Sequence, residues 1–243
     1  AGYALLLWNP MSYDASSMAR VLRQQVYSPL ILLVFAGLVA LYYRRQESFP
    51  RQARWSVLLG LSFAAFWLTR EEGLWIMPSV ILLAGAVLMG AWRDSREILM
   101  RSLKALGLAA GCALLPILTV AALNFHYYRW FGTVEFRAAD FQNAFGSLVR
   151  VRAGPDLPFV AITREAREAV YAVSPAFAKL RPHLEGAIGL GWAEASASVT
   201  QLPAEQRQIG GGWMTWALRD AVIAAGEGRT AGEAMAFYRR LAA

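Results

Sequence analysis

Thr69-Arg70-Glu71-Glu72-Gly73 places three charged side chains in a row between two apolar runs, residues 55–69 and 73–92. Charged groups next to the hydrocarbon core of a bilayer are costly, and those that occur there are often functional. The first run, at about 15 residues, is short for a full crossing, so the turn is expected to lie within the headgroup zone. The stretch therefore predicts two membrane helices joined by a tight, charged turn.

The composition extends this prediction to the whole chain. Of its 243 residues, 57% are hydrophobic and 17% are charged, which is too apolar for an ordinary soluble domain. The apolar residues lie mostly before Asn124 and the charged residues after it. We expect an all-α fold, in which a multi-pass transmembrane helical bundle (residues 1–123) is followed by a small helical extracytoplasmic domain (residues 124–243).

Three further apolar runs are candidates for membrane helices. Residues 26–43 and 103–123 are each long enough to span a bilayer, and residues 1–8 read as the end of another helix. Pro116 is tolerable within its run, because neighbouring helices can satisfy the carbonyl that a proline frees. The aromatic residues at 125–131 follow the last run and predict an anchor at headgroup level.

The basic residues predict the orientation of these helices. The loops at 44–54 and 93–104 each hold four Lys or Arg, whereas the turn at 69–73 holds one Arg and two Glu. The positive-inside rule places the two basic loops in the cytoplasm. The charged turn, the connector at 9–25 and everything after residue 123 then face outward, in a protein of the cell membrane and, we expect, of a bacterial inner membrane.

The net charge of +7 comes almost entirely from Arg. These residues cluster beside apolar runs and do not form a stripe with interleaved aromatics, so a nucleic-acid partner is not expected. Anionic membrane lipids are the expected partner. His126, His183 and Cys112 have no further ligands at metal-site spacing, so no metal is expected.

The second half predicts several short helices. Apolar spacing favours an amphipathic helix over about 136–151 and another over 163–173. Ser174-Pro175 is a helix start, whereas Arg181-Pro182 and the stretch from Gly186 to Gly191 break the helical pattern. The glycines at 210–212 precede a helix, and Thr230 with Glu233 forms a capping box before the last one.

Asp220 lies four residues after Trp216 and shares a helix face with it. A carboxylate in this position is expected to accept a hydrogen bond from a Trp indole or an Arg, in preference to acting as a catalytic acid.

The charged turn carries the main site hypothesis. Arg70 with Glu71 and Glu72 is a set that can bind a phosphate and orient a hydroxyl, and Arg20 and Arg23 could complete the anion site. The alternative is that residues 69–73 form a solvated tight turn between two membrane helices, and that Arg20 and Arg23 lie on a helix that contacts lipid headgroups.

The run Leu68-Thr69-Arg70-Glu71-Glu72-Gly73-Leu74-Trp75-Ile76-Met77-Pro78 resembles a pattern in GT-C membrane glycosyltransferases. In that pattern a helix ends in a Thr-Arg-Pro-Glu-Gly-like turn, and the next helix begins with apolar residues and a Pro. Glu71 stands where Pro is common, and the resemblance covers only the two runs around the turn.

The resemblance implies a transferase that moves a sugar from a polyprenyl-phosphate carrier to an acceptor on the outer face. Arg70 would contact the lipid phosphate, with Glu71 or Glu72 as its partner, and the outward domain would help to bind the acceptor. The family's essential acid lies in the first outward loop. Because this chain opens within an apolar run, we expect a C-terminal fragment that needs the N-terminal part of the same protein for activity. It would hold no cofactor besides the lipid-linked sugar donor.

Two other functions remain open. A non-catalytic module of an envelope assembly complex needs only the membrane helices and the helical domain. A transporter would require polar residues within the spans, which are nearly free of them.

Overall fold

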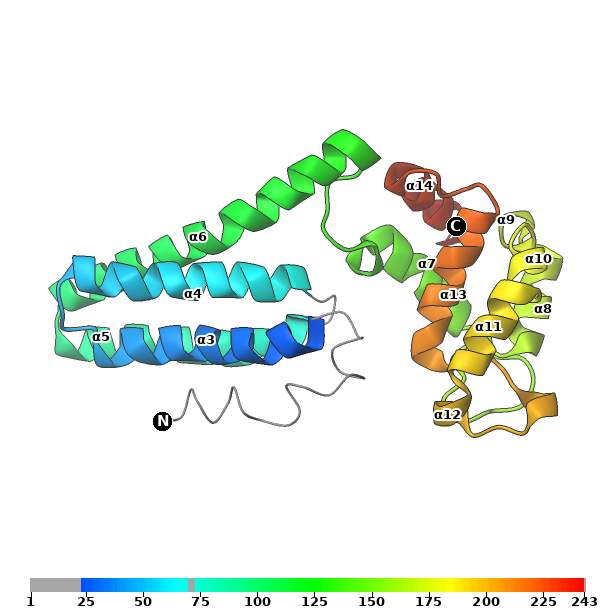
Figure 1. Ribbon diagram of the computed structural model, residues 1–243, viewed down its shortest axis with the longest axis horizontal. Helices are drawn as coiled ribbons and strands as arrows, with labels where there is room; N and C mark the ends of the chain where they lie inside the picture. The colour runs from blue at the N-terminus through cyan, green and yellow to red at the C-terminus, as the bar shows by residue number, and fades with distance from the viewer. Residues whose placement is uncertain (1–22, 70–72, 243) are drawn as a thin grey trace. The chain divides into compact units, whose positions relative to one another are not determined.

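The computed structural model describes residues 23–69 and 73–242 (Figure 1). Every regular element within these ranges is a helix, which confirms the all-α prediction. The chain divides into two compact units, the first ending at Val120 and the second beginning at Ala121. The helix expected at residues 1–8 lies outside the described residues.

The first unit contains long apolar helices. Three segments of the described chain are long and apolar enough to cross a membrane: Val26–Tyr43, Gly73–Asp94 and Arg96–Tyr128. Many of their large apolar side chains are exposed, as membrane-facing surfaces require. The elements of this unit are α3 (Arg23–Tyr43), α4 (Phe49–Thr69), η2 (Gly73–Ile76), α5 (Met77–Asp94) and most of α6 (Arg96–Tyr128).

Helix α4 begins six residues earlier than the apolar run that predicted it, and it is not among the three candidate spans. Its first turn is built on Ser48, whose carbonyl accepts from the backbone amides of Arg51 and Gln52. Polar side chains do not stop a helix that packs inside a bundle. The Gln52 side chain is buried and donates to the carbonyls of Arg44, Arg45 and Glu47, so it also fixes the loop before the helix.

Helix α6 is likewise longer than the expected run of 103–123, because it continues through polar residues at both ends. Its start is capped by Ser95, whose hydroxyl accepts from the Ile98 amide at 3.1 Å. Pro116 lies inside the helix, as expected from the sequence. At 33 residues and a rise of about 1.5 Å each, α6 is about 50 Å long, which exceeds the thickness of a hydrocarbon core.

Two glycines allow the helices of the first unit to approach closely. A Cβ at Gly37 would lie 2.8 Å from the Cβ of Leu59, so the Leu59 side chain of α4 packs directly against the backbone of α3 there. A Cβ at Gly60 would collide with the carbonyl oxygen of Ala109 and the Cβ of Cys112. Small residues at such crossings are the usual means by which membrane helices pack.

The two basic loops meet at one end of the first unit. The Arg45 Nε atom lies 2.8 Å from a carboxylate oxygen of Asp94, and Arg101 donates to the Glu47 carbonyl at 2.9 Å. The end of α5 and the beginning of α6 are therefore held to the loop between α3 and α4.

The second unit is a cluster of shorter helices around an aromatic core. Phe141, Phe177, Phe237 and Tyr238 are fully buried, and α7 packs against α14. The elements are η3 (Glu135–Arg137), α7 (Ala139–Val149), α8 (Arg164–Val173), α9 (Pro175–Ala178), α10 (Arg181–Leu184), α11 (Ala187–Ala195), α12 (Ala197–Thr200), η4 (Ala204–Gln206), α13 (Gly211–Ala224) and α14 (Ala231–Ala242).

The local helix signals of this half are confirmed. The Ser174 hydroxyl accepts from the Phe177 amide at the start of α9, and the Thr230 hydroxyl accepts from the Glu233 amide in the first turn of α14. The two predicted breaks are correct only in part. Gly186 does lie between α10 and α11, whereas Arg181-Pro182 begins α10 and residues 187–191 lie within α11. A Cβ at Gly189 would collide with the Leu184 carbonyl oxygen, so glycine at this position permits close packing and does not end a helix.

Candidate functional site

The residues of the predicted phosphate site fall mostly outside the described part of the chain. This is true of Arg20, Arg70, Glu71 and Glu72. Arg23 is the first residue of α3. The structure therefore bears on this site through the helix ends that adjoin it.

Those helix ends are held together by aromatic contacts. Trp75, in η2, donates its indole N–H to the hydroxyl of Tyr27 at 2.8 Å. The ring of Tyr27 also stacks on Phe66 near the end of α4, with centroids 4.8 Å apart, and Phe66 is fully buried. The first turns of α3, the end of α4 and the beginning of η2 thus lie side by side.

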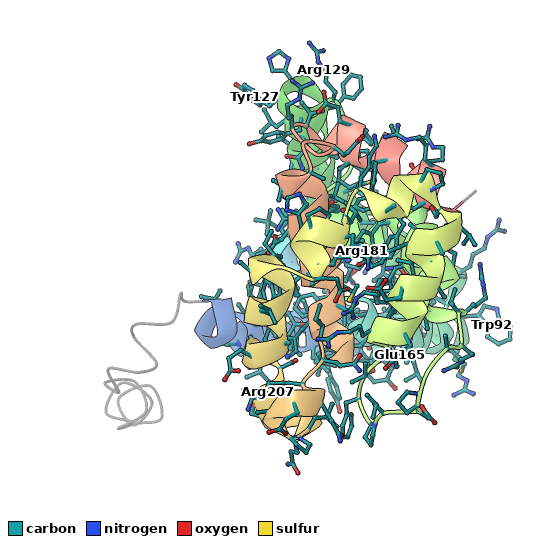
Figure 2. All side chains as sticks on the ribbon, turned by 90° about the vertical axis from the view of Figure 1, so that its right-hand side faces the viewer. Trp92, Tyr127, Arg129, Glu165, Arg181 and Arg207 are labelled. Atoms are coloured by element: carbon teal, nitrogen blue, oxygen red, sulfur yellow. The ribbon has the colours of Figure 1, made fainter. Side chains whose placement is uncertain are left out.

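The end of α6 carries the aromatic residues expected at a membrane interface. Phe125, Tyr127, Tyr128 and Phe131 are all exposed, and Tyr127 lies at the end of α6 together with Arg129 (Figure 2). These side chains are free to lie among lipid headgroups.

The turn that follows α6 packs against α14. Arg129 adopts a left-handed backbone conformation, with φ of 56°, and its carbonyl oxygen would lie 2.9 Å from a Cβ at Gly232. The side chain of Asn124 donates to the Gly132 carbonyl at 2.7 Å and closes the turn that follows the helix.

Three tryptophans of the second unit form a stacked cluster. Trp192 of α11 stacks on Trp213 and on Trp216 of α13, with centroid distances of 5.7 and 6.4 Å and 25° between the ring planes in both pairs. Asp220 accepts a hydrogen bond from the Trp192 indole at 2.9 Å. The predicted partnership of Asp220 with an indole is therefore confirmed. The sequence did not identify Trp192, because its helix was read as an interruption.

Two carboxylates tie the helices of the second unit together. Glu135 accepts from the Tyr238 hydroxyl at 2.7 Å and from Arg219 at 3.0 Å. Glu227 accepts from Lys179 at 2.5 Å and from Arg240 at 2.6 Å. Each carboxylate bridges elements that are distant in sequence.

The most buried of these bridges joins α8 to Glu185. Arg167, whose side chain is only 3% exposed, donates two hydrogen bonds to the Glu185 carboxylate at 2.6 and 3.1 Å. The hydroxyl of Tyr171 donates to the same carboxylate at 3.1 Å. Burial alone would raise the pKa of Glu185, but the hydrogen bonds and charge of Arg167 outweigh it and lower that pKa below its usual value.

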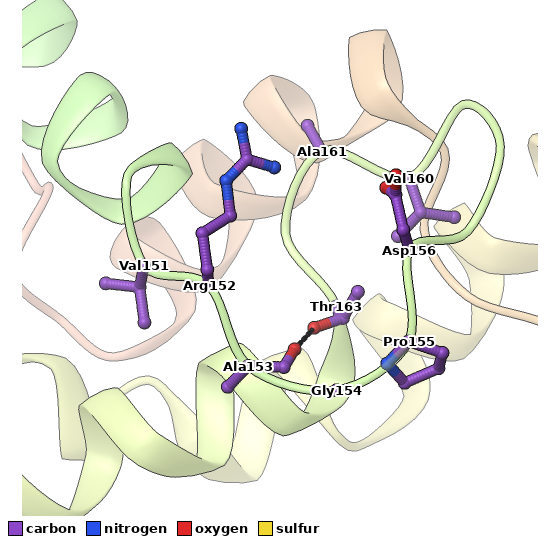
Figure 3. A pocket seen from close by; sticks show the side chains of 9 residues that line it. All are labelled: Val151, Arg152, Ala153, Gly154, Pro155, Asp156, Val160, Ala161 and Thr163. Carbon is purple, nitrogen blue, oxygen red and sulfur yellow. Dashed lines mark hydrogen bonds between the residues drawn. The ribbon is translucent and has the colours of Figure 1, made fainter.

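Two hollows in this unit flank the loop between α7 and α8. One has a volume of about 380 Å³, and Arg152 and Asp156 line it from opposite sides (Figure 3). Thr163 closes its base by donating to the Ala153 carbonyl at 2.6 Å. A second hollow of about 420 Å³ lies beyond Pro155 and is lined by charged side chains that include Glu165 and Arg207.

No metal centre is formed by the described residues, which contain no group of three potential ligand side chains. Cys112 is a free, half-buried thiol on α6.

Comparison of the chain with protein-family models, with curated proteins and with solved structures finds no match to any of the three.

Proposed function

We propose that this chain is part of an integral membrane glycosyltransferase of the GT-C type. It would transfer a sugar from a polyprenyl-phosphate carrier to an acceptor outside the cell. The observation that carries the proposal is the aromatic contact of Tyr27 with Trp75 and Phe66, which brings the start of α3 beside both helix ends that adjoin the charged turn. A lipid phosphate bound at this end of the unit would lie beside the helix ends that adjoin residues 70–72 in sequence.

In this proposal Arg70 contacts the phosphate, Arg20 and Arg23 add positive charge, and Glu71 or Glu72 orients Arg70 or a substrate hydroxyl. Guanidinium groups suit this role because their paired N–H donors match phosphate oxygens. The acid that activates the acceptor is expected upstream of this chain.

The proposed orientation follows from α6. If the basic loops lie in the cytoplasm, a helix about 50 Å long that begins at Arg96 carries its other end to the outer face. The second unit begins at that end of α6. The proposed transfer and the second unit would then share the extracytoplasmic side.

The test is sugar transfer by the full-length protein carrying Arg70→Ala. We expect transfer to be lost while the protein still inserts in the membrane. Arg51→Ala, at the opposite end of α4, is the matched control and should leave transfer intact. Normal transfer by Arg70→Ala would remove the turn from the site.

A non-catalytic, membrane-anchored module of an envelope complex is the second candidate. It is favoured by the carboxylates Glu135, Glu185 and Glu227, each of which is held by cationic side chains as a structural bridge. A stoichiometric protein partner, recovered with a full-length protein that transfers no sugar, would support this candidate over the first.

A further inference from the structure

The tryptophan cluster of the second unit is defined here as Trp192, Trp213 and Trp216, with Asp220 at its edge. Trp213 is 36% exposed, and the other two rings are half-buried. The cluster is therefore partly a packing contact between α11 and α13 and partly a surface of the protein.

The space beside this surface is open. A Cβ at Gly212 would have no heavy atom within 4 Å, and the same is true at Gly191. Gly212 is next to Trp213 in sequence and lies one helical turn before Trp216, on the same helix face. Neither glycine has a positive φ, so backbone conformation does not require glycine at these positions. Bare backbone at these positions leaves room beside the indoles.

A carboxylate lies at the edge of the cluster. Asp220 accepts from the Trp192 indole through one carboxylate oxygen, and an ionised carboxylate can accept several hydrogen bonds. The guanidinium of Arg219 lies over the ring of Trp216, 5.9 Å from its centre, and donates to Glu135, so it covers part of that ring. The surface thus combines the exposed ring of Trp213 with an acceptor at the edge of the cluster.

This combination matches the chemistry of a pyranose ring. A sugar with equatorial hydroxyls presents axial C–H groups on its flat faces and hydroxyls around its rim. Aromatic faces contact the apolar part, while a few polar groups at the edge bind the rim and set the orientation. We propose that the tryptophan cluster binds a saccharide, with Trp213 as the exposed stacking ring and Asp220 accepting from a sugar hydroxyl.

Saccharide binding by the cluster does not depend on whether the protein also transfers sugar. A lipid-facing or protein-docking surface would use the same indoles for their apolar area, but it would not require the carboxylate. The variants below separate these possibilities.

Cellotetraose is a suitable probe, because its β-linked glucose units have only equatorial ring substituents. The full chain in lipid nanodiscs is titrated with cellotetraose by calorimetry, and saturation-transfer NMR then identifies the sugar protons in contact with the protein. We expect saturable binding with a dissociation constant in the millimolar range or below, and the strongest transfer to axial ring protons.

Trp213→Ala should weaken binding by about tenfold or more, because it removes the exposed ring. Asp220→Asn should also weaken it, by removing the charged acceptor. Gly212→Leu is the sharpest variant. It fills the open space and replaces a helical glycine, so the helix should be at least as stable while binding falls. Val173→Ala, which trims an exposed apolar side chain on α8, is the control and should bind normally.

Three results would overturn the inference. They are the absence of saturable binding by the unaltered chain, undiminished binding by Gly212→Leu in a folded protein, and equal losses from Val173→Ala and Trp213→Ala.

Discussion

Arg167 and Glu185 are joined by two hydrogen bonds across 18 residues of sequence, and the arginine side chain is almost completely buried. The pair joins α8 to the segment after α10. Because both partners are at least partly removed from water, the loss of one leaves a charge that the protein cannot solvate well.

Replacing Arg167 by Ala should destabilise the second unit by about 3 kcal/mol or more. The cause is the Glu185 carboxylate, which would remain in place without its main partner. Hydrogen–deuterium exchange of α8 and of the backbone around Glu185 measures the effect locally. Arg181→Ala, which breaks an exposed pair with Glu168, is the control and should cost about 1 kcal/mol or less. Equal effects of the two variants would contradict this account.

The lowered pKa of Glu185 predicts an acid-sensitive second unit. An unperturbed glutamate titrates near 4.5, and the folded-state pKa of Glu185 is lower. Its contribution to stability is therefore present above pH 4.5 and is lost as the pH falls through the folded-state pKa. Glu227 adds to the same trend, because its hydrogen bond from Lys179 and the charges of Lys179 and Arg240 lower its pKa.

Glu185→Gln should make the stability of the second unit less dependent on pH below 4.5. Exchange rates measured at several acidic pH values in the variant and the unaltered chain provide the comparison. An identical dependence in both would show that Glu185 does not contribute to acid sensitivity.

The close contact at Gly60 predicts that a larger side chain there separates α4 from α6. Gly60→Val would place its side chain against Ala109 and Cys112, at a cost of about 1–3 kcal/mol. Cys112 is the only cysteine of the chain, so its alkylation rate reports on this contact. We expect the rate to rise several-fold in Gly60→Val.

Gly85→Val is the matched control, because Gly85 is also within a long helix but faces open space. It carries the same β-branched residue without the clash. If both variants alkylate at the same rate, the helices do not meet at Gly60 as described.

The proposed orientation predicts opposite labelling at two exposed positions. In a Cys112→Ala background, Ser48→Cys lies in a basic loop and should react with a membrane-impermeant maleimide only after the cells are permeabilised. Asp156→Cys, in the loop of the second unit, should react in intact cells. Labelling of both positions from the same side would refute the proposed orientation.

The sequence predicted the features that depend on local chemistry. Helix starts at Ser174 and Thr230 were found because a hydroxyl that caps a helix acts within three residues. The apolar runs revealed the long helices because a membrane imposes their length and composition.

The errors occurred where distant contacts decide the structure. Helix α11 contains glycines that disfavour a helix locally, but it forms because Gly189 packs against Leu184 and Trp192 stacks on α13. The true start of α4 depends on Gln52, whose buried side chain makes polar contacts that a hydropathy pattern does not contain. The partners of Glu135 lie 84 and 103 residues away in sequence. No rule based on local spacing could predict contacts at such separations.

The last turns of α6 take part in the fold of the second unit through Asn124 and Arg129. A boundary drawn by hydrophobicity would therefore cut through a folded unit. An excised version of the second unit for solution work should begin before Ala121, and it would need the exposed aromatic residues of α6 to be made polar. Asn124 should be retained, because it holds the turn that leads into the rest of the unit.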